Sequence, residues 1–189
     1  MTIPATGPAR PLRSDARRNR ETVLDAASAL FAERGDAVGM DEIAERAGVG
    51  VGTLYRHFAD KSALRAAIIG RRFEEMAAVA QAAAEITDPG AAFEVLLERY
   101  LAAIEPDAAF RRALLGDEEP SWSEIVAQKA AFSASVKRVV ERAVAAGSLR
   151  PDFTVADFIL LTRGAMANMG SGDWRRHLTL QLEGIRRPS

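Results

Sequence analysis

Apolar residues recur every three or four positions along most of this chain, a spacing that places them on one face of an α-helix. No stretch of useful length alternates apolar and polar residues as a half-buried strand does. The first helical stretch covers residues 15–33 and ends before Gly35, with an apolar face formed by Val23, Leu24, Ala27, Leu30 and Phe31. We therefore predict an all-α fold of roughly nine helices joined by short connections.

Capping residues, proline and glycine divide the rest of the chain into further helices. Asp88 followed by Pro89 is a strong helix start, because proline suits the first helical position behind an aspartate cap. Ser121 with Glu124 and Thr154 with Asp157 have the spacing of a capping box. The predicted helices after residue 60 cover about residues 61–86, 89–104, 106–115, 121–146, 154–170 and 173–185.

Residues 40–64 carry a more specific pattern than helical spacing alone. Two short helices that cross through a tight turn need a small residue at the crossing and a turn residue that tolerates positive φ. Ala44 and Gly48 meet these two demands, and Leu54 and Phe58, four apart, would hold the second helix down. The segment is therefore predicted to be a helix-turn-helix, with its second helix at about residues 51–58.

The outward side of that second helix carries residue types that suit a DNA groove. Glycine allows close backbone approach, hydroxyl and imidazole groups donate to phosphate, and arginine can address phosphate or a guanine edge. Lys61 begins the next helix, whose N-terminus is a natural phosphate contact; the alternative is a solvated surface charge. The predicted DNA-binding residues are Arg17, Gly50, Val51, Gly52, Thr53, Tyr55, Arg56, His57 and Lys61.

Arginines cluster before and within the first predicted helix. The formal net charge of the chain is -1, so binding to DNA would need a local basic patch rather than a basic protein. The arginines are Arg10, Arg13, Arg17, Arg18 and Arg20, opposed only by Asp15. They form either a solvated arm or one that follows the DNA backbone or enters the minor groove.

The helix-turn-helix segment closely resembles the TetR family of bacterial transcriptional regulators. The resemblance rests on Ile43-Ala44, Ala47-Gly48-Val49 and Gly52-Thr53-Leu54-Tyr55-Arg56-His57-Phe58, followed by Lys61 and Leu64. At the caps of the two short helices, where the family often has serine or threonine, this chain has Gly39 and Gly50. Glycine is a tolerated cap, so the fold should survive while a hydroxyl contact is lost.

The resemblance implies an N-terminal DNA-binding head and a helical C-terminal domain that binds a ligand and forms a homodimer. On this basis we expect a disordered arm at residues 1–14, the head at 15–60, a connecting helix at 61–86 and the ligand-binding and dimerisation domain at 87–189. The last two long helices would form the dimer through Phe158, Leu161, Leu178, Leu182 and Ile185. Residues suited to an apolar ligand, each of which could instead be a plain core residue, are Phe93, Tyr100, Phe110, Trp122, Phe132 and Met166.

The function that the resemblance implies is a regulator, most simply a repressor, that binds a palindromic double-stranded DNA operator as a dimer and is released by a small apolar ligand. A second interpretation keeps the DNA-binding head but replaces the ligand with a protein partner. A third is an enzyme built on a helical bundle, which no metal-ligand or nucleophile motif supports. His177, flanked by Arg176 and Leu178, is expected to be a surface or interface residue.

Composition adds a few limits to these interpretations. The chain has 189 residues, of which 48% are hydrophobic, enough for a substantial core. It contains no cysteine, which excludes disulfides and thiolate metal sites, and we expect no metal and no cofactor. No apolar run is long enough for a membrane span, and the first residues lack the apolar core of a signal peptide, so a cytoplasmic location is expected.

Overall fold

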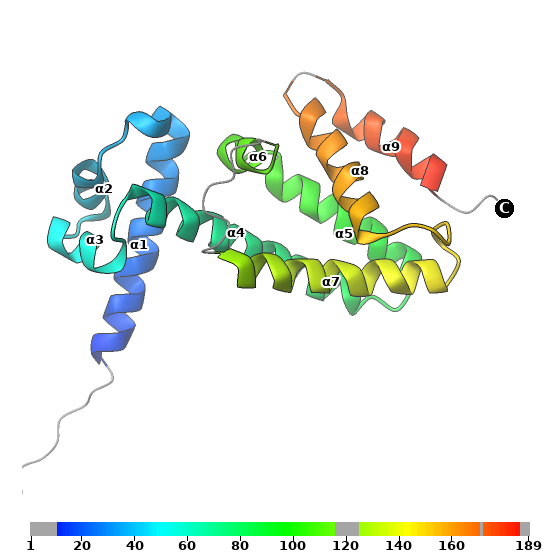
Figure 1. Ribbon diagram of the computed structural model, residues 1–189, viewed down its shortest axis with the longest axis horizontal. Helices are drawn as coiled ribbons and strands as arrows, with labels where there is room; N and C mark the ends of the chain where they lie inside the picture. The colour runs from blue at the N-terminus through cyan, green and yellow to red at the C-terminus, as the bar shows by residue number, and fades with distance from the viewer. Residues whose placement is uncertain (1–10, 116–124, 171, 186–189) are drawn as a thin grey trace, which may run out of the picture. The chain divides into compact units, whose positions relative to one another are not determined.

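The computed structural model describes residues 11–115, 125–170 and 172–185, and these ranges contain nine α-helices, one short 3-10 helix and no strand (Figure 1). The all-α prediction is confirmed. The elements are α1 (Pro11–Arg34), η1 (Gly35–Ala37), α2 (Met40–Ala47), α3 (Val51–His57), α4 (Lys61–Ala84), α5 (Pro89–Ile104), α6 (Ala108–Leu115), α7 (Val126–Ala145), α8 (Val155–Asn168) and α9 (Trp174–Ile185). None of the helices in these ranges is long and apolar enough to cross a membrane.

Several predicted helix starts are confirmed by their caps. The Asp88 carboxylate accepts a hydrogen bond from the Ala91 N–H at 2.7 Å, with Pro89 at the first helical position of α5. Thr154 and Asp157 form the reciprocal capping box that was predicted for α8. The other predicted capping box, at Ser121 and Glu124, lies outside the described residues.

Two helix boundaries differ from the prediction for identifiable reasons. α1 begins at Pro11, four residues before the predicted start at residue 15, and residues 1–10 of the predicted arm lie outside the described residues. Proline fits a first helical position because its φ is already helical and that position needs no N–H partner. α6 begins at Ala108 because the Asp107 carboxylate caps it, accepting from the Phe110 N–H at 2.9 Å.

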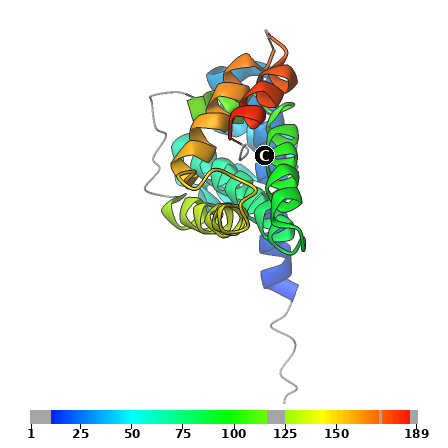
Figure 2. The same ribbon diagram turned by 90° about the vertical axis from the view of Figure 1, so that its right-hand side faces the viewer.

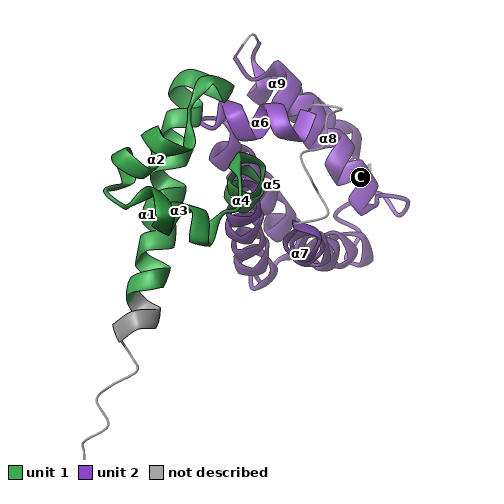
Figure 3. Cartoon of the chain, turned by 60° about the vertical axis from the view of Figure 1, so that its left-hand side comes forward, with its two compact units in different colours: residues 1–68 green, residues 69–189 purple. Residues whose placement is uncertain are grey.

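The chain divides into two compact units at residues 68 and 69, inside α4 (Figure 3). This boundary lies two turns beyond the predicted start of the connecting helix, because the first turns of α4 pack into the core of the N-terminal unit through Leu64, with Ala67 and Ile68 against it. The buried core of this unit consists of Val23, Leu24, Ala27, Leu30, Phe31, Val38, Met40, Ile43, Ala44, Leu54, Phe58 and Leu64.

In the C-terminal unit, α5, α7 and α8 pack against one another, α6 contacts α5 and α8, and α9 lies along α8 (Figure 2). Their shared core includes the fully buried Phe93, Leu96 and Phe158. Arg142 of α7 donates hydrogen bonds to the carbonyls of Ala84 and Ile86, which explains why α4 ends at Ala84 rather than at the predicted residue 86.

Candidate nucleic-acid interface and ligand-binding unit

A left-handed glycine makes the turn between α2 and α3. Gly48 has φ 65° and ψ 29°, a conformation that glycine adopts without a steric cost. Its N–H donates to the Glu45 carbonyl at 3.0 Å, and the Val49 N–H donates to the Ala44 carbonyl at 3.0 Å. Ala44 is fully buried where the helices cross, and Val49 packs against the same core. The predicted helix-turn-helix is therefore present.

α3 is buried on one side and exposed on the other. Leu54 is fully buried and Phe58 is 3% exposed, so these two residues hold the helix onto the core as predicted. The Gly50 carbonyl accepts from the N–H groups of Thr53 and Leu54, at 2.8 Å and 3.1 Å, and so starts the helix. The predicted DNA contacts in this segment are exposed or half-buried: Gly50, Val51, Gly52, Thr53, Tyr55, Arg56 and His57.

Arg56 is held against its own helix. Its Nε donates to the Gly52 carbonyl at 3.2 Å, and one terminal nitrogen donates to the Thr53 hydroxyl oxygen at 2.7 Å. A guanidinium group carries five N–H donors, so others remain available for phosphate or a base edge. These contacts fix the direction of the Arg56 side chain and therefore reduce the conformational entropy that it would lose on binding DNA.

Lys61 is half-buried and has one hydrogen-bond partner within the N-terminal unit. Its ammonium donates to the Asp36 carbonyl in η1 at 2.6 Å, while the Asp36 carboxylate forms an ion pair with Arg65 one turn further along α4. An ammonium group has three donors, so two remain for a phosphate. Asp60 caps the same helix start by accepting from the Ala63 N–H at 2.8 Å.

The predicted basic patch is described only in part. Arg17 is exposed on α1, and the guanidinium of Arg20 lies 5.4 Å from the centre of the Phe58 ring, at the end of α3. Arg20 also forms an ion pair with Glu21 at 3.5 Å. The position of Arg10 and the side chain of Arg13 lie outside the described residues.

Buried aromatic rings form a continuous row through the C-terminal unit, with neighbouring ring centres 5.4 to 6.4 Å apart. The row contains four of the six predicted ligand residues, and another of them, Met166, is also buried. Phe73, Phe153 and Phe158 were not predicted to belong to it, although the helical spacing of Phe73 marks it as a buried residue. In order, the row is Phe110, Phe73, Phe132, Tyr100, Phe158, Phe93 and Phe153.

Tyr100 is the polar member of this row. Its ring stacks on Phe132 at a centre distance of 5.4 Å, and burial raises the pKa of its hydroxyl above the ordinary value. Desolvation is the cause of this shift. The Tyr100 hydroxyl stays a predicted contact for a polar atom of a ligand. Trp122, the other polar candidate, lies outside the described residues.

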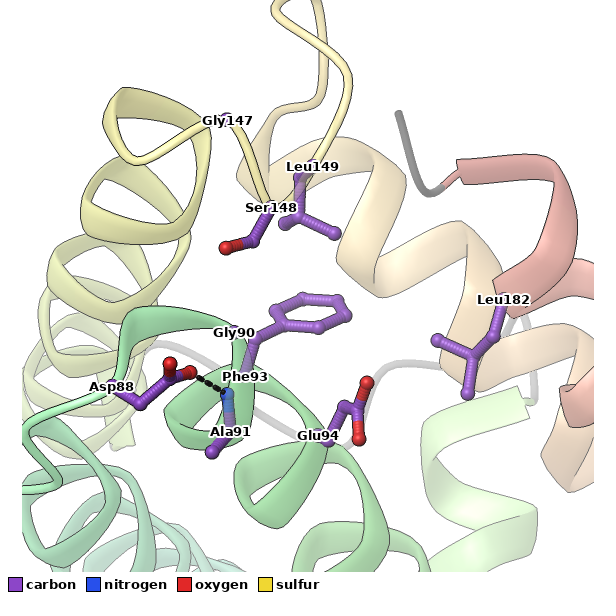
Figure 4. Close-up of a pocket in the computed structure, with 9 residues that line it drawn as sticks. All are labelled: Asp88, Gly90, Ala91, Phe93, Glu94, Gly147, Ser148, Leu149 and Leu182. Carbon is purple, nitrogen blue, oxygen red and sulfur yellow. Dashed lines mark hydrogen bonds between the residues drawn. The ribbon is translucent and has the colours of Figure 1, made fainter. Parts of the chain in front are cut away.

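A pocket of about 360 Å³ opens at the start of α5, between the turn after α7 and Leu182 of α9 (Figure 4). Phe93 is the one predicted ligand residue among those that line it. The full lining is Asp88, Gly90, Ala91, Phe93, Glu94, Gly147, Ser148, Leu149 and Leu182.

Comparison with known proteins matches both parts of the chain to models of transcriptional regulators. A family model described as bacterial regulatory proteins of the tetR family matches residues 23–68, and a second, described as the C-terminal domain of SbtR-like transcriptional regulators, matches residues 88–187. The crystal structure of a TetR transcription regulatory protein from Mycobacterium vanbaalenii is 34% identical, covers 94% of this chain and 100% of its own, and has a TM-score of 0.70. The chain belongs to the TetR family.

Two curated relatives of this TetR-family protein match it over shorter segments. FasR of Mycolicibacterium smegmatis, a helix-turn-helix transcriptional activator, is 35% identical over 66% of this chain and 58% of its own length. A helix-turn-helix transcriptional regulator of Staphylococcus aureus is 46% identical over 32% of this chain and 33% of its own length. The chain therefore spans well under two thirds of either relative, and the match to the second is confined to about the length of a DNA-binding head.

Membership of the TetR family makes this protein a transcriptional regulator with a DNA-binding helix-turn-helix, and not an enzyme. Within the described ranges, no group of three or more histidine or acidic side chains is placed to hold a metal ion.

The residues of the dimer face predicted for this TetR-family protein differ in their exposure. Phe158 and Leu161 are 1% and 5% exposed, because they point into the core of their own subunit. Leu178, Leu182 and Ile185 are half-buried against the rest of the chain. The large apolar residues exposed on α8 and α9 are instead Ile159, Leu160 and Leu180, at 49%, 74% and 52%.

Proposed function

We propose that this TetR-family protein is a transcriptional repressor that binds a palindromic operator as a homodimer and releases it when a small apolar molecule binds. The observation that carries the DNA-binding part is α3, which presents Val51, Tyr55 and Arg56 outward while Leu54 and Phe58 fix it to the head. The regulated DNA and the protein would meet in the cytoplasm.

Two heads are needed because one short helix covers only a few base pairs. Half-sites read by a dimer lie about 34–36 Å apart or a multiple of this spacing. Exposed apolar side chains on two neighbouring helices support α8 and α9 as the dimer face, since Ile159, Leu160 and Leu180 would otherwise remain in water.

The ligand-binding part is supported by the aromatic row and by the pocket at the start of α5. The row offers a buried apolar core around one hydroxyl, and the pocket combines the apolar Phe93, Leu149 and Leu182 with the polar Asp88, Glu94 and Ser148. A ligand changes DNA affinity only if it prefers the arrangement that does not bind DNA. A preference of about a hundredfold would weaken operator binding by the same factor.

The direction of regulation needs its own test, because FasR, a relative, is named an activator. We expect repression, since a dimer on an operator within a promoter blocks polymerase without further contacts. The test is in vitro selection of random duplexes by the full-length protein, followed by transcription from a promoter that carries the selected site. Lower transcription with added protein supports a repressor, higher transcription makes it an activator, and failure to enrich any sequence refutes sequence-specific DNA binding.

A further inference from the structure

The outward side of α3 divides into three rows of residues four positions apart. Residues four apart lie on the same face of a helix, so Val51 lies beside Tyr55, Gly52 beside Arg56 and Thr53 beside His57. Val51 and Tyr55 are 40% and 48% exposed, which makes them the two large exposed apolar side chains among the described side chains of residues 15–68. A purely hydrocarbon side chain thus projects from the first residue of the helix that faces DNA.

The two residues that flank Val51 in the sequence carry no side chain. Gly50 and Gly52 flank it, and a Cβ atom built on Gly52 would meet no other atom within 4 Å. Close approach of the backbone to a groove is therefore possible on both sides of Val51. Arg56 lies in a neighbouring row and is bonded to the Gly52 carbonyl and to the Thr53 hydroxyl.

Hydrocarbon has one specific counterpart on the base edges of the major groove. Guanine, adenine and unmodified cytosine present hydrogen-bond donors and acceptors there, whereas thymine adds a methyl group at C5. We infer that Val51 reads a thymine by contact with its C5-methyl group, and that each operator half-site has a thymine at the position that faces the start of α3. This inference rests on the proposed DNA-binding function and names the base that this part of α3 selects.

The same methyl group also occurs on 5-methylcytosine. Modified bases can therefore distinguish a contact with the methyl group alone from recognition of the whole thymine edge. Deoxyuridine lacks only the methyl group of thymine. A 5-methylcytosine paired with guanine keeps the methyl group but presents an amino donor in place of the O4 acceptor. Contact with the methyl group alone predicts that 5-methylcytosine substitutes for thymine and that deoxyuridine does not.

The experiment uses full-length protein and the operator obtained by selection from random duplexes. Each thymine of one half-site is replaced in turn by deoxyuridine, and affinities are measured for wild type and for Val51→Ala. At one thymine, the change to deoxyuridine should weaken wild-type binding about fourfold, the effect of removing one buried methyl-sized group from an apolar contact. Val51→Ala should bind the thymine and deoxyuridine duplexes with nearly equal affinity, and 5-methylcytosine at this position should restore wild-type binding.

The matched control is Val126→Ala, the same substitution at an exposed valine of α7, which should retain the full difference between the two duplexes. Val51→Ala should fold, because alanine is the better helix former and the site is exposed. The thermal unfolding midpoint of Val51→Ala, compared with that of wild type, checks that the variant is folded. If every deoxyuridine substitution affects wild type and Val51→Ala equally, or if the selected half-site contains no thymine, the inference is overturned while DNA binding stands. If no sequence is enriched, the proposed function itself has failed.

Discussion

Lys61 lies at the first position of α4 and donates from its ammonium to the Asp36 carbonyl of η1. The Asp36 carboxylate pairs with Arg65, and the Arg65 guanidinium lies 4.8 Å from the centre of the Phe31 ring of α1. These contacts connect three elements of the N-terminal unit through two exposed or half-exposed cations. Lys61 can therefore orient the start of α4 and contact a phosphate with the same group.

We predict that Lys61→Ala weakens binding to operator and random duplexes alike, because a phosphate contact carries no sequence information. The slope of log affinity against log salt should become shallower by about one for each lysine contact that is lost. Lys61→Gln is the control, since it keeps a side-chain donor for the Asp36 carbonyl but removes the charge. It should show the same change of slope with a smaller loss of thermal stability. An unchanged slope in both variants would remove Lys61 from the interface.

At the scale of elements, helix ends were predictable where a local group satisfies the backbone. Asp88, Gly48 and the pair Thr154 with Asp157 act within a few residues of their own positions, so sequence alone reveals them. The exposed face of α8 was not predictable in this way. α8 carries Phe158, Ile159, Leu160 and Leu161 in succession, so its spacing does not distinguish the two residues that face the core from the two that face outward.

A contact between residues far apart in the sequence joins the end of α5 to the start of α9. The Glu105 carboxylate accepts hydrogen bonds from Arg175, at 2.8 and 3.0 Å, and from the Trp174 indole at 2.8 Å. The hydrogen bonds from Arg175, which has the larger effect, and from Trp174 lower the pKa of the Glu105 carboxyl below its usual range. The 70-residue separation of Glu105 and Arg175 explains why no sequence pattern indicated this link.

We predict that this link weakens in acid. The pKa of Glu105 is lower in the folded than in the unfolded chain, so its contribution to stability is present above the unfolded-state pKa and is lost as pH falls through the folded-state value. Glu105→Gln should therefore be less stable than wild type at pH 7, and the difference should shrink toward pH 3. The midpoints of urea unfolding of the two proteins between pH 3 and pH 7 measure this difference in stability. A difference that does not depend on pH would contradict the stabilising role of the Glu105 carboxylate.

At the scale of the whole molecule, the exposed apolar side chains of α8 and α9 form the dimer face that we propose. Leu160 at 74% exposed is the most accessible large apolar residue recorded in the described ranges. Leu161, its neighbour, is 5% exposed and belongs to the core. A charged side chain at Leu160 would therefore destabilise the proposed interface. A charged side chain at Leu161 would destabilise the folded subunit.

We predict that Leu160→Glu combined with Leu180→Glu gives a folded monomer that no longer binds a palindromic operator. Two carboxylates per subunit at a dry interface are expected to outweigh its apolar contacts. Sedimentation measures the mass and circular dichroism the helix content. Val126→Glu, at an exposed valine of α7, is the control and should remain dimeric. A double variant that still dimerises would place the interface on another face.

The location of the ligand can be tested by two conservative variants that affect different sites. Tyr100→Phe removes the buried hydroxyl of the aromatic row, and Ser148→Ala removes a hydroxyl of the pocket at the start of α5. Apolar compounds that shift the thermal unfolding of wild type should lose about 1 kcal/mol of binding in the variant whose hydroxyl they contact. Compounds unaffected by both variants bind elsewhere. If no compound changes operator affinity, a protein partner becomes the better explanation of regulation.

The open space around Gly52 has a consequence for how such regulators diverge. Because a Cβ atom there meets no other atom, a mutation to serine, asparagine or glutamine would place a new polar group on the DNA-facing side without disturbing the core. Such a change would also replace a weak helix former with a better one. A lineage carrying this head could therefore acquire a new operator through a single codon change, with no compensating mutation elsewhere in the protein.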